Sequence, residues 1–342
     1  MLTQRLILTG DDQHDRPLIE QAGAIIRAGG LVAFPTETVY GLGADAYNPV
    51  ALQRIFQAKG RPAWDPLIVH VATPQQILEL TSGIPDLALP LIQRFMPGSL
   101  TLILPKSDRV STIITAGRDT VGIRMPSHPV AQALIRASGV PIAAPSANRF
   151  GRPSPTNADH VLHDLAGAIE AVLDGGETPR GVESTILDLT TDPPTLLRPG
   201  AVPLEAIEET IGTVRLLTEM LPRGMSLPAP GTMARHYAPR VPLLLSAPTP
   251  EALYGTVKDS LTQYEWVGVL RPRGWSLPDN GHLIVFEWGT WGEWDTLAQK
   301  LFYALRWLEG QGVHAIVAPL PPAEGLARAV RDRLTRASNP EQ

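Results

Sequence analysis

The sequence contains no cysteine in its 342 residues. A chain without cysteine cannot form a disulfide, a thiolate zinc site, an iron–sulfur cluster or a cysteine nucleophile. No apolar run approaches the ~18 residues of a membrane span. The short apolar stretch Leu6–Leu8 is followed at once by Asp11 and Asp12, unlike the apolar region of a signal peptide. We therefore expect a cytoplasmic protein with no membrane segment.

Several familiar catalytic and nucleotide-binding motifs are also missing. The sequence has no Gly-x-x-x-x-Gly-Lys-[Ser/Thr] loop, no His-Glu-x-x-His pair and no serine elbow of the hydrolase type. Gly41-Leu42-Gly43 lacks the third glycine of a dinucleotide fingerprint, so we interpret it as a turn after a strand. These absences leave no candidate for a covalent nucleophile, and they predict no metal site built by the protein itself.

The chain is long enough for two domains, at ~100–200 residues per domain. Apolar residues make up 44% of it, which is enough for ordinary buried cores. Strand and helix periods alternate from residue 16 to about 209, are lost over the Pro- and Gly-rich residues 213–239, and return after residue 240. We predict a larger α/β domain (1–212), a linker or lid (213–239) and a smaller α/β domain (240–342).

The alternation of periods also places individual elements. In the larger domain it predicts strands at 31–34, 67–71, 100–104, 121–125, 142–144, 171–173, 184–189 and 195–197, and helices at 16–28, 49–58, 74–80, 85–95, 129–138 and 157–166. In the smaller domain it predicts strands at 241–245, 266–270, 283–286 and 315–317, and helices at 250–262, 294–309 and 323–337. This mixture indicates an α/β fold with a mixed sheet.

Cations gather in the strand-end loops of a domain that is acidic overall. Residues 1–212 carry 16 Lys and Arg against 22 Asp and Glu. Ligands of open α/β sheets bind outside strand ends, and lysine, arginine and backbone donors suit phosphates and carboxylates. Any one of these arginines could simply be a solvent-exposed residue that keeps the protein soluble. Taken together, the cations in these loops predict a pocket for a polyanion or nucleotide. The set comprises Lys59, Arg61, Arg124, Arg149, Arg152 and Arg198.

Seven sequence blocks in the larger domain resemble, in order, the motifs of the YrdC-type threonylcarbamoyl-AMP synthases. They are Pro35-Thr36-Glu37-Thr38-Val39-Tyr40-Gly41-Leu42, Lys59-Gly60-Arg61-Pro62, Pro66-Leu67-Ile68-Val69-His70, Pro97-Gly98-Ser99-Leu100-Thr101, Gly122-Ile123-Arg124-Met125-Pro126, Ala144-Pro145-Ser146-Ala147-Asn148 and Glu183-Ser184-Thr185. The block His236-Tyr237-Ala238-Pro239 and the trailing domain are similar to the long, two-domain form of that family.

The resemblance implies a fold and a reaction. The fold would be a twisted mixed sheet around a basic cavity, followed by a small Rossmann-like domain. The reaction would join L-threonine, bicarbonate and ATP into threonylcarbamoyl-AMP and pyrophosphate, with Mg²⁺ held by the ATP phosphates. A separate transferase complex would then place the threonylcarbamoyl group on the tRNA adenosine next to the anticodon.

The resemblance also implies roles for individual residues. The positions that match threonine contacts are Thr38, His70, Arg124, the backbone of Ala144, and Ser184. The positions that match ATP contacts are Lys59, Arg61, Asp65, Thr120, Ser146, Asn148, Ser154, Arg198 and Tyr237. Lys59 and Arg61 are the candidate catalytic residues, and Lys59 is placed at the phosphates or the bicarbonate because its charge is compact.

Alternatives remain open at this point. The same positive cavity could serve an RNA-binding or ribosome-associated module, and direct contact with tRNA is undecided. The linker is a candidate lid that brings Tyr237 over the nucleotide. In the smaller domain, four arginines lie on one predicted helix, which we interpret as a solvated helix face rather than a docking surface. These are Arg328, Arg331, Arg333 and Arg336.

Overall fold

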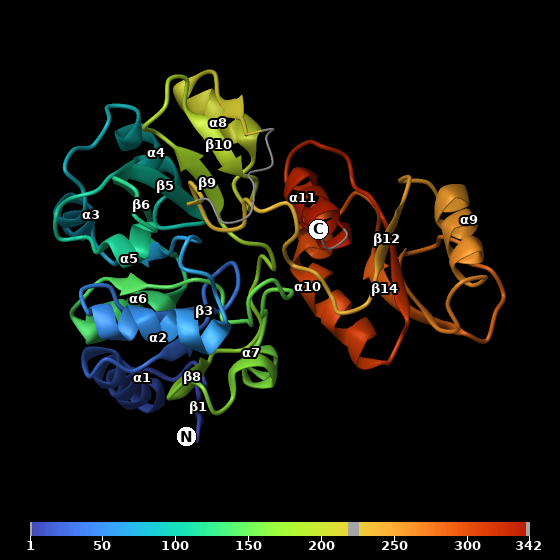
Figure 1. Ribbon diagram of the computed structural model, residues 1–342, viewed down its shortest axis with the longest axis horizontal. Coiled ribbons are helices and arrows are strands. Elements are labelled where there is room, and N and C mark those ends of the chain that lie inside the picture. Colours follow the sequence, from blue (N-terminus) through green and yellow to red (C-terminus); the bar gives the residue numbers. More distant parts are fainter. Residues whose placement is uncertain (1, 218–225, 340–342) are drawn as a thin grey trace. The chain divides into compact units, whose positions relative to one another are not determined.

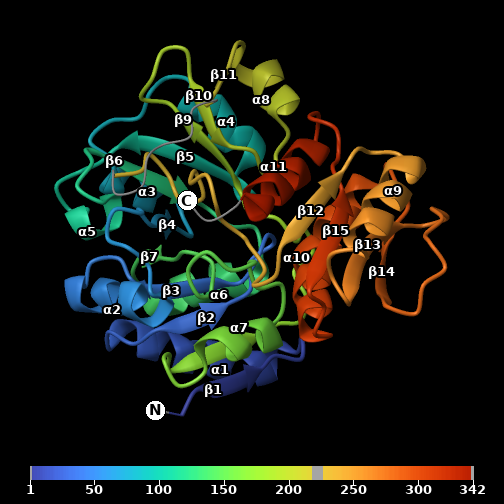
Figure 2. The ribbon, with the colours of Figure 1, turned by 45° about the vertical axis from the view of Figure 1, so that its right-hand side comes forward.

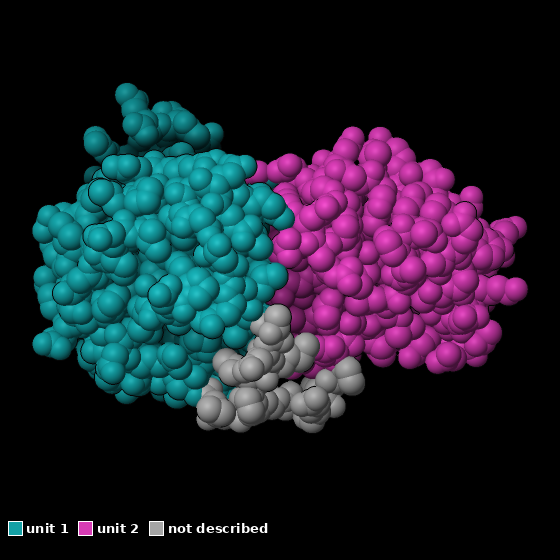
Figure 3. Space-filling model, turned by 90° about the horizontal axis from the view of Figure 1, so that it is seen from above, with its two compact units in different colours: residues 1–150, 154–179, 183–233 teal, residues 151–153, 180–182, 234–342 magenta. Residues whose placement is uncertain are grey.

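A computed structural model describes residues 2–217 and 226–339 of the chain (Figure 1). The chain divides into two compact units, coloured separately in Figure 3. Unit 1 comprises Met1–Phe150, Ser154–Pro179 and Glu183–Met233, and unit 2 comprises Gly151–Pro153, Arg180–Val182 and Ala234–Gln342. The described part of the expected linker is thus shared, with 213–217 and 226–233 in unit 1 and 234–239 in unit 2. The turn-rich residues 221–224 lie outside the described residues.

Unit 1 is built on one large mixed sheet (Figures 1 and 2). Its described strands follow the order β1-β8-β2-β3-β7-β4-β6-β5-β9-β10-β11. Their bounds are β1 Gln4–Ile7, β2 Val32–Phe34, β3 Gly41–Asp45, β4 Ile68–His70, β5 Leu100–Pro105, β6 Thr120–Arg124, β7 Ile142–Ala143, β8 Ala171–Asp174, β9 Thr185–Asp188, β10 Thr195–Arg198 and β11 Arg215–Leu216. The helices are α1 Asp12–Arg27, α2 Pro49–Lys59, α3 Pro74–Leu80, α4 Ala88–Phe95, α5 Thr112–Thr115, α6 Pro129–Ser138, α7 Ala158–Leu165 and α8 Leu204–Ile211.

The helix that carries Lys59 begins and ends where local sequence signals require. Asn48 Oδ1 accepts hydrogen bonds from the backbone N–H groups of Val50 and Ala51, and Pro49 occupies the first turn, where its missing N–H is tolerated. Gly60 has a left-handed φ of 63° and ends α2. This sharp stop holds Lys59 at the last turn and sends the chain directly toward Arg61.

The register of the central strands places three polar residues on one face of the sheet. His70 on β4 pairs with Arg124 on β6, and Arg124 pairs with Thr101 on β5. Directly opposed residues project to the same face, and so do residues two positions apart on one strand. Ile68, Gly122 and Ile103 therefore form a second, apolar row beside the polar one, in which Ile68 and Ile103 pack with Ile186, Leu197 and Ala229.

Because the sheet is mixed, amino and carboxyl ends of neighbouring strands meet at the same edge. β4 and β6 are parallel, whereas β5 runs antiparallel to β6 and β9 runs parallel to β5. The carboxyl ends of β4 and β6 consequently lie beside the amino ends of β5 and β9.

The segment Gly41-Leu42-Gly43, expected to be part of a turn, is instead in strand β3, because it pairs with both β2 and the chain after β7. The strands and helices β1, α5, α8 and β11 were not predicted.

Unit 2 has its own, smaller sheet. Its strands follow the order β12-β15-β13-β14, and all of these pairings are parallel. The elements are β12 Leu243–Ser246, α9 Pro250–Ser260, β13 Val267–Pro272, β14 Leu283–Gly289, α10 Trp294–Gly310, β15 Ala315–Pro319 and α11 Ala327–Ser338. The predicted fold class, a mixed α/β sheet followed by a smaller α/β unit, is confirmed. No helix among the described residues is both long and apolar enough to cross a membrane.

The interpretation of α11 as a solvated arginine face is wrong for Arg333. Its side chain is 0% exposed, whereas those of Arg328, Arg331 and Arg336 are partly exposed. Arg333 pairs with Asp332 at 2.5 Å, and its guanidinium carbon lies 4.9 Å from the ring centroid of Tyr237. A helical period alone could not separate Arg333 from its neighbours, because the aromatic ring that covers it lies about a hundred residues earlier in the sequence.

Candidate active site

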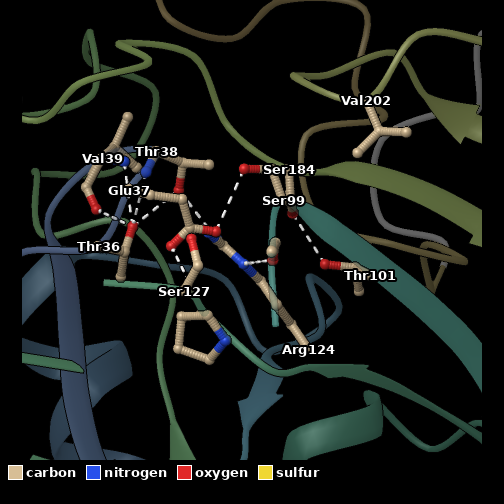
Figure 4. Close-up of polar contacts among 12 residues, drawn as sticks. Thr36, Glu37, Thr38, Val39, Ser99, Thr101, Arg124, Ser127, Ser184 and Val202 are labelled. Atoms are coloured by element: carbon tan, nitrogen blue, oxygen red, sulfur yellow. Dashed lines mark hydrogen bonds and ion pairs between the residues drawn. The ribbon is translucent and has the colours of Figure 1, made fainter. Parts of the chain in front are cut away.

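A buried ion pair between Arg124 and Glu37 lies at the centre of the candidate site (Figure 4). Arg124 is the last residue of β6, and its Nη2 lies 2.6 Å from Glu37 Oε1. Its Nη1 donates to Thr38 Oγ1 at 2.9 Å, and its Nε donates to the Gly98 carbonyl at 3.3 Å. These contacts hold the guanidinium plane in one orientation. A guanidinium held in this way can bind a carboxylate through two parallel hydrogen bonds.

Ser184, just before β9, joins this cluster through Thr101. Ser184 Oγ and Thr101 Oγ1 are 2.8 Å apart, and Arg198 Nη2 donates to Ser184 Oγ at 3.2 Å. Arg198 also donates to the Ser184 carbonyl through Nε at 3.2 Å and Nη2 at 3.0 Å. All three side chains are buried. The Ser184 hydroxyl is therefore oriented by two neighbours on the Arg124 side of the sheet.

Replacing Thr101 by valine should weaken this arrangement without changing its shape. The variant removes the hydroxyl beside Ser184 and leaves a side chain of similar shape. For the activity that the sequence resemblance implies, we expect the threonine KM to rise about fivefold, equivalent to one hydrogen bond of ~1 kcal/mol. Steady-state kinetics at a saturating ATP concentration measure this threonine KM. Thr191→Val is the matched control, because it removes a similar hydroxyl contact, to Thr195 at 2.9 Å, away from the cluster. Equal effects of the two variants would contradict the role of Thr101.

His70 contributes a neutral ring to the same row. It is buried at the end of β4 and lies edge-on to Phe34, with the ring centroids 6.2 Å apart. Burial, together with the nearby charge of Arg124, lowers the pKa of His70 to about 3. Its Nδ1 is buried and has no hydrogen-bond partner within the described part of the chain. A neutral imidazole can donate from one ring nitrogen and accept at the other, so His70 can bind a polar group of a small ligand.

The lowered pKa of His70 predicts a pH dependence of stability. Between pH 3 and 6.5 the unfolded chain binds a proton at His70 that the folded chain does not, so folding stability rises with pH in this window. Lowering the pH from 7 to 5 should therefore cost about 2 kcal/mol through His70 alone. Urea unfolding at both pH values should show a pH effect about 2 kcal/mol smaller in His70→Gln. An identical pH effect in the two proteins would contradict it.

Lys59 holds the loop that follows β7. Its side chain is buried, and its Nζ donates to the Ser146 carbonyl at 2.5 Å and also to the Asn148 carbonyl. The Phe150 N–H in turn donates to the Lys59 carbonyl at 2.8 Å. The structure thus brings together three of the predicted ATP contacts, namely Lys59, Ser146 and Asn148. The lysine both shapes this loop and places a positive charge within it.

Arg61 and Asp65 form a second buried ion pair. Arg61 Nη2 lies 2.9 Å from Asp65 Oδ1, and the guanidinium also donates to the carbonyls of Asp65 and Pro66, at 3.0 and 2.6 Å. Burial raises the pKa of Asp65 to about 6, although the charges of Arg61, Lys59 and Arg198 favour the carboxylate. Neither Asp65 oxygen makes a hydrogen bond of acceptable geometry to a described residue. Asp65 is therefore a buried acceptor among three cations.

A hollow that is partly open to solvent lies beside the apolar row of the same sheet. Thr120 and Gly122 of β6 line it on the sheet side, and the segment Pro228–Pro230 lines it as well. Thr115 and Arg118 also line it, and Thr115 Oγ1 and Arg118 Nε are buried atoms without a hydrogen-bond partner among the described residues. A hollow lined by both apolar and polar groups is typical of a small-molecule site.

The remaining predicted residues lie in three different settings. Ser154 Oγ donates to Glu183 Oε1, next to Ser184, and the Ala144 N–H donates to the Ile68 carbonyl at 2.9 Å. Tyr237 belongs to unit 2, where it has a left-handed φ of 62° and its ring lies 5.6 Å from that of Phe302. A positive φ is uncommon for a residue other than glycine. The contact of Tyr237 with ATP remains a prediction.

The structure adds residues that we did not predict as site residues. Glu37 pairs with Arg124, Ser99 donates to Glu37, and Thr101 lies within hydrogen-bond distance of Ser184. Thr115 and Arg118 line the hollow. Glu37, Ser99 and Thr101 lie within sequence blocks that carry the family resemblance, so their position in those blocks was an available signal. Nothing in the local sequence distinguishes Thr115 or Arg118, since the hollow is completed by residues 228–230 from far along the chain.

The described residues do not form a metal-binding cage. Within 2–217 and 226–339, no three His, Asp or Glu side chains gather closely enough to hold an ion. Asp65 lies among the predicted nucleotide contacts, but it is fully buried and pairs with Arg61. Magnesium in proteins prefers several oxygen ligands, usually including water. The protein donor set therefore does not fit a resident magnesium ion.

Comparison with known proteins identifies the same two parts of the chain. The Sua5_yciO_yrdC family model, described as "Telomere recombination", matches residues 24–200, and the model "Threonylcarbamoyl-AMP synthase, C-terminal domain" matches residues 202–339. The Threonylcarbamoyl-AMP synthase of Pyrococcus abyssi is 46% identical over 94% of each chain. The one of Bacillus subtilis is 45% identical over 99% of this chain and 98% of its own.

A solved structure extends the similarity to the fold. The crystal structure of P. abyssi Sua5 complexed with L-threonine has a TM-score of 0.89 and 43% sequence identity, and it covers 99% of this chain and 98% of its own. The similarity therefore spans both the large mixed sheet and the small parallel one. With both family models matched and relatives similar over nearly their whole length, this chain belongs to the threonylcarbamoyl-AMP synthases, in the two-domain form with a Sua5 C-terminal domain.

Proposed function

We propose that this enzyme joins L-threonine, bicarbonate and ATP into threonylcarbamoyl-AMP and pyrophosphate. We also propose that L-threonine and ATP both bind on one face of the unit 1 sheet. The observation that carries the proposal is the continuity of that face. Arg124 and Gly122 lie two positions apart on β6, about 7 Å along the strand. Arg124 belongs to the polar row, and Gly122 lines the hollow.

The polar row suits the amino-acid substrate. L-Threonine carries a carboxylate, an amine and a hydroxyl within a few ångströms. Arg124 offers a fork for the carboxylate, while Thr38, Ser184 and His70 offer partners for the polar groups, as does the backbone at Ala144. All of these groups are buried, so their hydrogen bonds are strong and a missing ligand group is costly.

The hollow and the cations beside it suit the nucleotide. The lining of the hollow combines apolar groups with Thr115, Arg118 and Thr120, so we assign it to the base or ribose end of ATP. We place that part of ATP at Thr120, and the phosphates near the cations Lys59, Arg61 and Arg198. The ATP set also includes Asp65, Ser146, Asn148, Ser154 and Tyr237.

The chemistry requires positioning more than a covalent nucleophile. The neutral threonine amine attacks bicarbonate to give the carbamate and water, and a carbamate oxygen then attacks the α-phosphorus of ATP while pyrophosphate leaves. Both partners of the second step are anions, so holding them in line and neutralising charge supply most of the rate. Lys59 and Arg61 are the cations that we assign to this task.

We place the reaction in the cytoplasm, with Mg²⁺ arriving as part of the ATP complex and held by the phosphates and water. The product would pass to a separate transferase complex that modifies tRNA. We prefer this function to an RNA-binding or ribosome-associated module, because Lys59, Arg61, Arg124 and Arg198 are each at most 7% exposed. Buried cations of this kind can bind a small enclosed anion but cannot follow a polynucleotide backbone.

Pyrophosphate release by the purified full chain tests this function directly. We expect release from ATP only when L-threonine and bicarbonate are both present, together with an AMP-containing product. Omitting either one should reduce release to the background rate. Pyrophosphate release that does not depend on threonine would contradict the proposal. Salt-sensitive tRNA binding without any ATP turnover would favour the RNA-binding alternative.

A further inference from the structure

We propose that Glu37 is a positioning residue for substrate, which acts by holding Arg124 in the orientation that receives the threonine carboxylate. The proposal rests on the function proposed above, in which Arg124 binds that carboxylate. Glu37 itself would touch no substrate atom. Its role would be to fix the direction in which the guanidinium of Arg124 presents its remaining donors.

The contacts of Glu37 form a complete socket around its carboxylate. Oε1 accepts from Arg124 Nη2 at 2.6 Å and from Ser99 Oγ at 3.2 Å, and Oε2 accepts from the Ser127 N–H at 3.1 Å. Figure 4 shows the side chains of Arg124 and Ser99 and the backbone of Ser127 converging on the Glu37 carboxylate from separate segments of unit 1. The carboxylate thus connects three segments of unit 1, which are the carboxyl end of β6, the turn before β5 and the loop that contains Thr38.

The charge of Glu37 is retained despite its burial. Burial alone would raise its pKa, but the guanidinium of Arg124 and the Ser127 N–H hold the pKa below its ordinary value. The side chains of Arg124 and Glu37 are 5% and 10% exposed. A buried ion pair of this geometry is much more directional than a surface pair, because neither partner can exchange its contact for water.

The hydrogen-bond donors of Arg124 indicate why the orientation of its guanidinium matters for a carboxylate ligand. A guanidinium has five N–H groups. In the described structure Nε donates to the Gly98 carbonyl, Nη1 to Thr38 and Nη2 to Glu37. One N–H remains on each terminal nitrogen. Glu37 and Thr38 therefore each occupy one terminal nitrogen, and the remaining pair is available for the two oxygens of a carboxylate.

Threonine affinity of the Glu37→Gln full chain, measured by calorimetry and by steady-state kinetics, tests the proposal. We expect the threonine Kd and KM to rise at least tenfold, with the ATP KM changed less than twofold. Glu209→Gln is the matched control, since Glu209 pairs with Arg94 at 2.9 Å on the surface and its side chain is 66% exposed. A Glu37→Gln protein whose threonine and ATP constants change equally would overturn the proposal in favour of a purely structural role.

A double substitution tests whether Glu37 acts through Arg124. In the Arg124→Ala background, adding Glu37→Gln should change the threonine Kd less than twofold, because the group that Glu37 orients is already gone. A further tenfold loss in the double variant would overturn the proposal. If Arg124→Ala alone leaves the threonine Kd unchanged, the proposed threonine site itself is wrong. If Arg124→Ala weakens binding and Glu37→Gln does not, only the role of Glu37 is wrong.

Ser99→Ala keeps the test decisive if Glu37→Gln does not fold. This variant preserves the ion pair and removes only the hydroxyl that donates to Glu37 Oε1 at 3.2 Å. We expect the threonine Kd to rise two- to fivefold with the ATP KM unchanged. An unchanged threonine Kd in folded Ser99→Ala would overturn the proposal.

Discussion

Replacing Arg124 by alanine should raise the threonine KM roughly 100-fold, with the ATP KM changed less than about threefold, since a charge-assisted bidentate contact is worth ~3 kcal/mol. Among the side chains that we assign to threonine, Thr38, His70 and Ser184 are neutral and cannot replace the charge of Arg124. The selectivity for threonine over ATP follows from the position of Arg124, which lies in the polar row rather than in the hollow.

The same substitution should also reduce stability. Removing Arg124 leaves Glu37 buried beside Ser99 and Ser127 without its counter-charge, and breaking a buried pair in this way typically costs ~3–5 kcal/mol. Thermal unfolding monitored by circular dichroism separates this effect from binding, and kinetics should be measured well below the new midpoint. Arg94→Ala removes a surface arginine and should change neither quantity appreciably. A change confined to the ATP KM of Arg124→Ala would show that this arginine belongs to the nucleotide site.

Replacing Gly200 by alanine should be the most disruptive single methyl addition near the site. A Cβ at this position would lie 2.2 Å from the Thr185 nitrogen, 2.3 Å from the Ser184 carbonyl carbon and 2.5 Å from the Glu183 oxygen. All three are backbone atoms, so no side chain can turn aside to make room. The segment that carries Ser184 must move away from the one that carries Arg198, and we expect a loss of at least about 3 kcal/mol of stability.

Urea unfolding of Gly200→Ala measures that loss, and Gly83→Ala provides the control. An added Cβ at Gly83 meets no atom within 4 Å, so this variant should stay within about 0.5 kcal/mol of the parent chain. If Gly200→Ala still folds, its threonine KM should rise, because Ser184 is displaced. Equal stability of the two variants would mean that strands β9 and β10 are less closely packed at the site than we describe.

Much of this architecture could be predicted from local sequence signals. The bounds of α3 and α6 agree with their predictions to the residue, because proline at the first turn and an apolar stripe mark them clearly. Most strands of the unit 1 sheet were predicted as short apolar runs between turn residues, whereas β1, β3 and β11 were not. The residues of the polar row then follow from the strand ends, once the family resemblance has indicated which ends matter.

What could not be predicted depends on contacts between distant segments. Gly41-Leu42-Gly43 has the composition of a turn, and only its pairing with β2 and with Ser146 makes it a strand. Arg333 has the charge of a surface residue, but it is buried beside Asp332 and the ring of Tyr237, which lies about a hundred residues earlier in the sequence. Glu37 stands in a predicted site loop, but its function becomes visible only when Arg124 is placed beside it, and the hollow likewise appears only with residues 228–230 in place.

A crystal structure of the full chain with L-threonine and a non-hydrolysable ATP analogue tests the central claim most directly. That claim is that the amino acid and the nucleotide bind next to each other on one face of the unit 1 sheet. We predict the threonine carboxylate on the terminal nitrogens of Arg124, the Glu37 contact intact, and the adenosine end of the analogue at Thr120 in the hollow. Threonine bound away from Arg124, or a nucleotide bound away from this face, would contradict the account.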